Sequence, residues 1–163
     1  MRRIVGVAAG IIGAALIAVV ATSCGSDSTA PALPTYTATL SGANEKPNAI
    51  TSSGTGVATF VDAGSEIDWT LQFDGLTNAF ASHIHGPGDA NTVAGVIVNL
   101  FLPVGNTGAP KPVTMQGVIT NNSNTSVSLD SLRALFNNGK AYVNVHTTAN
   151  GGGEIRGQVS RSN

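Results

Sequence analysis

The sequence predicts an all-β sandwich of about eight short strands with one short helix. The chain of 163 residues contains 20 glycines and seven prolines, which favour many turns between short elements. In the clearest strand, residues 67–73, Ile67, Trp69, Leu71 and Phe73 alternate with polar residues. This period of two places the four large side chains on one face of a half-buried strand. Short runs of this kind, separated by turn-rich segments, are typical of a sandwich or barrel.

Seven further runs complete the predicted set of strands, namely residues 36–40, 56–61, 82–86, 95–102, 113–120, 141–147 and 154–160. The run 95–102 is almost entirely apolar, so it is expected to be buried on both faces. One helix is predicted between Ser128, a capping residue, and Gly139, which suits a helix C-terminus. Its apolar side should close an edge or end of the sheet; that side consists of Leu129, Leu132, Leu135 and Phe136.

The N-terminal segment has the layout of a secretory signal. Arg2 and Arg3 precede an uncharged apolar run over residues 4–20, and small residues follow up to Cys24. Residues 1–23 are therefore predicted to be a cleaved signal peptide. A retained membrane anchor is the alternative, because the apolar run approaches the roughly 20 residues of a membrane span.

Cys24 resembles the lipid-accepting cysteine of a bacterial lipoprotein signal, although Ala21 stands where that pattern usually has leucine. The alternative is an incidental free thiol. Residues 24–34 are rich in Ser, Thr and Pro and are expected to be a flexible tether, followed by a folded domain over residues 35–160. The protein should then be an extracytoplasmic, membrane-anchored lipoprotein. Gly25, which is not acidic, favours the outer membrane or the cell surface.

Composition excludes several classes of protein. Charged residues make up 10% of the chain, against about a quarter in ordinary domains, and the formal net charge is -1. These values argue against a coiled coil, a basic nucleic-acid-binding protein and a charge-driven disordered chain. No serine lies in a Gly-x-Ser-x-Gly elbow and the single cysteine lies in the tether, so nucleophilic catalysis is not expected.

The three histidines of the chain, His83, His85 and His146, are the candidate functional residues. If residues 82–86 are extended, the imidazoles of His83 and His85 leave the same face. His146 lies in a second predicted strand, on the face opposite Val143 and Val145. If the two strands adjoin, which the sequence leaves open, the three imidazoles form an open site for one metal ion. Imidazoles suit zinc, copper, iron or nickel, and the absence of thiolate ligands in an extracytoplasmic protein favours copper or zinc. The alternative is that each histidine braces a turn through hydrogen bonds to backbone carbonyls.

Three charged residues, Asp89, Glu154 and Arg156, are candidates for the rim or the surroundings of this site. Asp89 and Glu154 are candidates for a fourth ligand or for an acceptor that fixes a histidine tautomer. Glu154 and Arg156 share one face of their predicted strand, which favours a surface ion pair. In the alternative arrangement, Arg156 lies near the histidines, where it would attract an anion.

Four segments resemble the CHRD domain, the chordin-type domain found in an animal antagonist of bone morphogenetic proteins and in bacterial secreted proteins. They are Leu40-Ser41-Gly42-Ala43-Asn44-Glu45-Lys46-Pro47, His83-Ile84-His85-Gly86-Pro87, Tyr142-Val143-Asn144-Val145-His146-Thr147 and Gly153-Glu154-Ile155-Arg156-Gly157-Gln158. The resemblance covers residues 36–159. It departs from the family at residues 46–48, where Val-Pro-Pro is more usual. It implies an extracellular binding module with a protein partner.

A weaker likeness connects Gly75-Leu76, His83-Ile84-His85 and Gly88-Asp89 with the copper-binding strand of copper-zinc superoxide dismutase. This likeness implies an immunoglobulin-like or superoxide-dismutase-like Greek-key sandwich, with His83 and His85 as copper ligands. A complete dismutase site is excluded, because that enzyme uses more histidines than this chain has. The hypotheses are therefore a module that binds one copper or zinc ion, an interaction module with structural histidines, and a mononuclear copper redox protein.

Overall fold

The domain is an antiparallel sheet of nine strands that curls into two layers, in a computed structural model that describes residues 31–100, 112–123 and 125–162. The first layer has the order β1 (Thr35–Ser41), β2 (Thr55–Asp62), β3 (Ile67–Asp74) and β6 (Val113–Ile119). The second has the order β5 (Val96–Leu100), β4 (Ala79–His85), β7 (Tyr142–Thr147) and β8 (Ile155–Gln158). The short β9 (Ser160–Arg161) also pairs with β1. The predicted all-β sandwich is confirmed.

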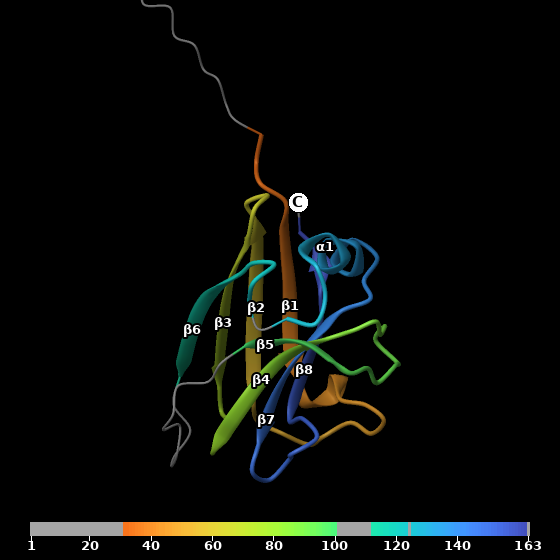
Figure 1. Ribbon diagram of the computed structural model, residues 1–163. Helices are drawn as coiled ribbons and strands as arrows, with labels where there is room; N and C mark the ends of the chain where they lie inside the picture. The colour runs from red at the N-terminus through yellow and green to blue at the C-terminus, as the bar shows by residue number, and fades with distance from the viewer. Residues whose placement is uncertain (1–30, 101–111, 124, 163) are drawn as a thin grey trace, which may run out of the picture. The chain divides into compact units, whose positions relative to one another are not determined.

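The two layers are joined by connections of the Greek-key kind. The chain passes from one layer to the other between β3 and β4, between β5 and β6, and between β6 and β7. Among the strands that the structure describes, the two layers are joined where β1 pairs with β8, at Ser41 and Arg156. Figure 1 shows the strands of the second layer crossing in front of those of the first. The layers can therefore enclose one core between their facing sides.

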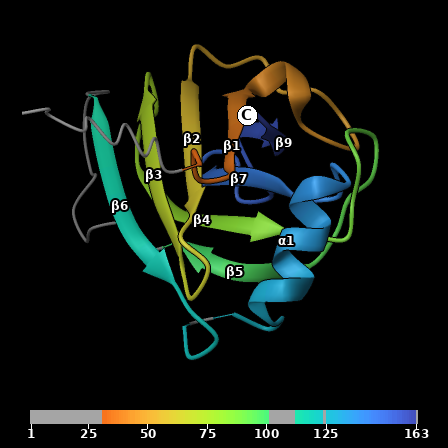
Figure 2. The ribbon, with the colours of Figure 1, turned by 90° about the horizontal axis from the view of Figure 1, so that it is seen from above.

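The core follows from the alternation along β2 and β3. Ala58 and Phe60 on β2 are fully buried, as are Ile67 and Leu71 on β3, while their neighbours in the strands are more exposed. The helix α1 (Leu129–Asn137) adds Phe136, whose ring centroid lies 4.9 Å from that of Phe60 and 5.2 Å from that of Tyr36. Seen from above, α1 lies beside the open side of the curled sheet (Figure 2).

The ends of α1 are those that the sequence predicts. The Ser128 side chain accepts a hydrogen bond from the backbone N–H of Ser131 at 3.2 Å, which caps the first turn. Gly139 has φ +60° just after the helix, a left-handed conformation that glycine adopts without strain. A bidentate pair also ties the helix to β2, because Arg133 Nε and Nη2 lie 2.8 and 2.9 Å from the Asp62 carboxylate.

Every strand differs from its predicted bounds by at least one residue, and three of them differ by more than one residue at one end. Strand β4 begins at Ala79, three residues earlier than predicted, because Ala79 pairs with Thr147 of β7. The predicted strand 154–160 is divided into β8 and β9, since Val159 is fully buried and its N–H bonds to the Ala141 carbonyl. Strand β5 ends at Leu100, and residues 101 and 102 lie outside the described residues.

The predicted signal peptide, Cys24 and residues 24–30 of the predicted tether also lie outside the described residues. Residues 31–34, which complete that tether, belong to no helix or strand. No helix in the described part of the chain is long and apolar enough to span a membrane.

Candidate metal centre

The structure brings the three histidines together on the outward face of the second layer. Strands β4 and β7 are antiparallel neighbours, with His146 opposite Ala81 and Tyr142 opposite His85. One ring nitrogen from each of His83, His85 and His146 lies within 4.8 Å of the other two. His85 and His146 are buried and His83 is half-buried. The period of two along both strands therefore turns separate sequence positions into one cluster.

Backbone carbonyls fix the tautomers of two of the rings. His85 Nδ1 lies 2.9 Å from the Ala94 oxygen, and His146 Nδ1 lies 3.0 Å from the Gly151 oxygen. A carbonyl only accepts, so both rings carry their proton on Nδ1 and present the lone pair of Nε2. His83 Nδ1 lies 2.9 Å from His146 Nε2 and donates to it in the metal-free protein. Among the described residues, nothing bonds to the buried Nε2 of His85.

The cluster is neutral at pH 7. Burial lowers the pKa of all three histidines, and for His83 the repulsion of His146 and His85 adds to this and lowers the pKa to about 4. For His85 and His146 the bonds to backbone carbonyls oppose part of the lowering. A metal ligand must be deprotonated, so the lowered pKa values favour metal binding; His85 and His146 already present a bare Nε2, whereas His83 binds through Nδ1 only after its proton has moved from Nδ1 to Nε2.

The spacing of the nitrogens suits a single ion after a small adjustment. Metal–imidazole bonds are about 2.0–2.1 Å, so two nitrogens on one ion lie at most about 4.2 Å apart. The 2.9 Å between His83 Nδ1 and His146 Nε2 corresponds to a right angle at such an ion. The two nitrogens that lie farthest apart are up to 4.8 Å from each other. They must approach by less than about 1 Å to bind opposite sides of one ion, and by somewhat more to bind it at a tetrahedral angle.

The Tyr142 ring packs face to face against the His85 ring. The two rings are stacked with centroids 4.8 Å apart and an angle of 3° between their planes. The Tyr142 hydroxyl accepts the Ala94 N–H at 3.0 Å and lies 3.2 Å from the Ala94 oxygen. The same residue, Ala94, thus fixes both the tyrosine and the histidine.

The guanidinium of Arg156 covers the Tyr142 ring, with Cζ 3.5 Å from the ring centroid. Arg156 is 2% exposed, and its Nη2 donates to the backbone oxygens of Asp89 and Thr92 at 2.7 and 2.9 Å. The predicted surface ion pair with Glu154 is therefore wrong. Arg156 lies instead in the row that runs across the layer through Asn144 to His83, which is the alternative arrangement.

Asp89 and Glu154 do not fix a histidine tautomer, because backbone carbonyls do so. The Asp89 carboxylate is bonded to Lys140 at 2.9 Å and to Thr92 at 2.8 Å, and these bonds lower its pKa. The Glu154 carboxylate accepts from Ser52 at 2.7 Å and from Thr147. Both acidic residues brace the loops around the cluster and lie outside the three-histidine group.

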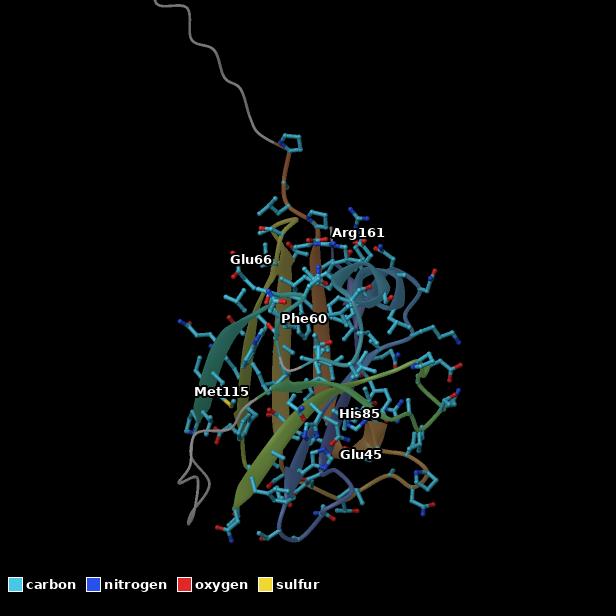
Figure 3. All side chains as sticks on the ribbon, viewed as in Figure 1. Glu45, Phe60, Glu66, His85, Met115 and Arg161 are labelled. Atoms are coloured by element: carbon cyan, nitrogen blue, oxygen red, sulfur yellow. The ribbon has the colours of Figure 1, made fainter. Side chains whose placement is uncertain are left out.

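Glu45 is a residue of this region that the sequence analysis did not single out. It is 4% exposed, and its two carboxylate oxygens lie 2.9 and 3.2 Å from Asn144 Nδ2. Burial raises its pKa to about 7, against the opposing effects of Arg156 and of hydrogen bonds from Lys46 and Asn144. Glu45 and His85 lie on the same side of the domain in Figure 3. The only signal for it in the sequence was its place in the segment 40–47.

The comparison with known families agrees with this arrangement. The family model of the CHRD domain matches residues 36–159, which include every strand from β2 to β8, the histidines, Glu45 and Arg156. The chain belongs to the CHRD domain family. No curated protein and no solved structure matches the chain. Membership supports an extracellular type of binding module and assigns no activity.

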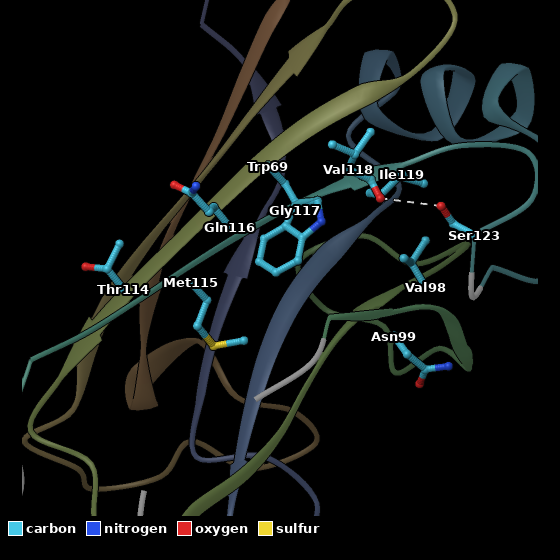
Figure 4. Close-up of a pocket in the computed structure, with 10 residues that line it drawn as sticks. All are labelled: Trp69, Val98, Asn99, Thr114, Met115, Gln116, Gly117, Val118, Ile119 and Ser123. Carbon is cyan, nitrogen blue, oxygen red and sulfur yellow. Dashed lines mark hydrogen bonds between the residues drawn. The ribbon is translucent and has the colours of Figure 1, made fainter. Parts of the chain in front are cut away.

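The CHRD domain also has a cavity of about 530 Å³ that no histidine lines (Figure 4). It lies between β6 and β5, with the Trp69 ring over Gly117 and with Met115 and Val98 in its wall. No ionisable side chain is among the ten residues that line it. The histidine cluster is therefore the better candidate for acid–base chemistry and for metal binding.

Proposed function

We propose that the domain binds one copper or zinc ion through His83, His85 and His146. The observation that carries the proposal is the buried, unpartnered Nε2 of His85 in a group of three histidines whose ligand atoms lie within 4.8 Å of one another. A buried acceptor without a donor is costly, so such an atom in a cluster of neutral imidazoles is explained by a ligand. An ion would also replace the one hydrogen bond between His83 and His146.

The donor set favours these two metals. Three neutral imidazoles suit zinc, copper, iron and nickel, whereas magnesium and calcium prefer oxygen ligands; the absence of thiolate ligands and the proposed extracytoplasmic location narrow the choice to copper or zinc. The hydrogen bonds around the cluster are also of the kind that metal-ligating histidines usually have. Two of the three rings, His85 and His146, donate their Nδ1–H to a backbone carbonyl. A fourth position would remain for water or for a small ligand, which permits either metal storage or redox chemistry at a mononuclear copper.

Elemental analysis of residues 31–163, the compact unit of the chain, tests the proposal. The protein is purified from periplasm, dialysed against a weak chelator and compared with His85→Ala and with Asp68→Asn, an exposed residue of β3. We expect about one copper or zinc ion per chain in the wild type and in Asp68→Asn, and none in His85→Ala. Absence of metal from all three folded proteins would overturn the proposal.

A second candidate function is an extracellular protein-interaction module with structural histidines. Membership of the CHRD family favours it. In that case, His85→Ala would leave the metal content unchanged and would act only through folding. The protein partner would then be sought by affinity capture on intact cells.

We further propose that a lipid on Cys24 anchors the domain to a membrane, at the outer membrane or the cell surface. The proposal is supported by the basic start, the apolar run and the small residues that precede Cys24. Cys24→Ser should move the full-length protein from the membrane fraction to the soluble fraction. Retention of this variant in the membrane would instead favour an uncleaved apolar segment.

A further inference from the structure

Arg156 has hydrogen-bonding capacity that the protein does not use. Its Nη2 makes both of its side-chain hydrogen bonds, and within the described residues no acceptor lies on Nε or Nη1. No carboxylate there lies within ion-pair distance of it. Such a buried guanidinium ordinarily has an anionic partner, because the charge loses most of its hydration.

Arg156 is 2% exposed as a whole, yet it borders a cavity. Arg156 lines a cavity of about 200 Å³ together with Asn44, Lys46, Ala90, Asn91 and Gln158. The cavity lies between the loop after β1 and the loop after β4, and no carboxylate is among these lining residues.

A second cation faces the same cavity. Lys46 is half-buried and forms no ion pair within the part of the chain that the structure describes. The nearest acidic residues compensate the two cations only in part. Asp89 is bonded to Lys140, and the pKa of Glu45, at about 7, leaves that carboxyl partly protonated at neutral pH.

We infer that this cavity binds a small oxyanion, with the planar guanidinium N–H groups of Arg156 as its main contact and Lys46 at its rim. Guanidinium N–H groups in a plane match the paired oxygens of a phosphate or carboxylate. The volume fits an inorganic anion or a short carboxylate and excludes a nucleotide. Stacking on Tyr142 and the two bonds from Nη2 hold the guanidinium in place, so that little entropy is lost on binding.

This site is separate from the histidine cluster and does not depend on the proposed metal. Tyr142 contacts both His85 and Arg156, and its strand β7 lies between β4, which carries His85, and β8, which carries Arg156. The binding experiment is therefore done on chelator-treated residues 31–163, in which the outcome is independent of metal content.

Isothermal titration calorimetry with inorganic phosphate, sulfate and acetate tests the inference in a chloride buffer. We expect one anion per chain. Preference for phosphate and sulfate would identify a tetrahedral oxyanion, and preference for acetate would identify a carboxylate. Arg156→Lys keeps the positive charge but loses the paired, coplanar N–H donors of the guanidinium, and should raise the Kd roughly tenfold or more.

Lys46→Gln and Lys140→Gln form the matched pair of variants. Both remove one lysine charge, but only Lys46 lines the cavity, whereas Lys140 is bonded to Asp89. Lys46→Gln should raise the Kd about two- to fivefold and Lys140→Gln should leave it nearly unchanged. If Arg156→Lys does not fold, the two lysine variants alone test whether the anion binds in this cavity. Equal effects of the two lysine variants, or no binding of any of the three anions, would overturn the inference.

Discussion

The two layers of the sandwich bury their strands in different ways. In the first layer, β2 and β3 alternate between buried and more exposed residues, so the outward face meets solvent. In the second layer, all six residues of β7 are buried, including the polar Asn144, His146 and Thr147. Loops cover the outward face of β7, and this creates a second, polar interior outside the hydrophobic core.

The difference separates stability from function within one small domain. An apolar face between the layers suffices to hold the sheet together. Burying histidine, asparagine, glutamate and arginine on the opposite face costs free energy unless each finds a partner. The candidate metal and anion sites are found in the layer that carries this cost, where perturbed pKa values also collect.

The largest effect is expected in the shared core. Phe60→Ala removes a fully buried ring that packs on Phe136 and should lower the free energy of unfolding by about 3–5 kcal/mol. Denaturant titration measures this loss. Since Phe60 is remote from the cluster, the metal bound per folded chain should not change. A parallel loss of metal in protein that is still folded would show that the two interiors are coupled.

Glu45 should give the polar interior a characteristic pH dependence. Its folded pKa of about 7 exceeds the unfolded value of 4.5, so its contribution is fully present below pH 4.5 and is lost as the pH rises through 7. The free energy of unfolding of Glu45→Gln should therefore rise relative to that of the wild type over this range, by on the order of 3 kcal/mol at pH 8. Unfolding of metal-free protein at pH 4.5 and pH 8 measures this change, and a constant difference would show that folding does not shift the pKa of Glu45.

A matched pair of polar residues compares the outward faces directly. Asn144→Ala removes the donor to a buried carboxylate and should destabilise the domain by about 1–3 kcal/mol. Gln72→Ala, on the exposed face of β3, should change stability by less than about 0.5 kcal/mol. Chemical denaturation of both variants at one pH gives the comparison. Similar losses would mean that the loops shield β7 less than its burial indicates.

Asp62 should show the opposite pH dependence from Glu45, with a smaller effect. Hydrogen bonds from Arg133 hold its pKa below 3.8, so its contribution is present above that pH and is lost as the pH falls through the lower folded pKa. Asp62→Asn should cost about 1 kcal/mol at pH 7 and little at pH 2. Acid titrations of wild type and variant test this, with Asp68→Asn as the exposed control. If Asp62→Asn is still less stable than the wild type at pH 2, the variant destabilises the domain through altered packing and not through the lost charge.

Much of the fold was predictable from the sequence, because period two and capping residues act locally. The alternation over residues 67–73 gives β3, and Ser128 and Gly139 bound the helix. The separation of His83 and His85 by one residue places both imidazoles on one face of any strand. What remained open was which strand lies beside β4, because hydrogen bonding between strands depends on the whole chain.

The tertiary structure decided the environment of the site. The pairing of β4 with β7 brings His146 to the histidine pair, and the loops that cover β7 bury Arg156 and Glu45. A sequence pattern shows which side chains share a face but not whether that face meets solvent. For this reason Arg156 could be read as half of a surface ion pair, whereas covering loops remote in sequence make it a buried cation. Residue identity thus determined the available chemistry, and desolvation by distant segments determined where that chemistry is usable.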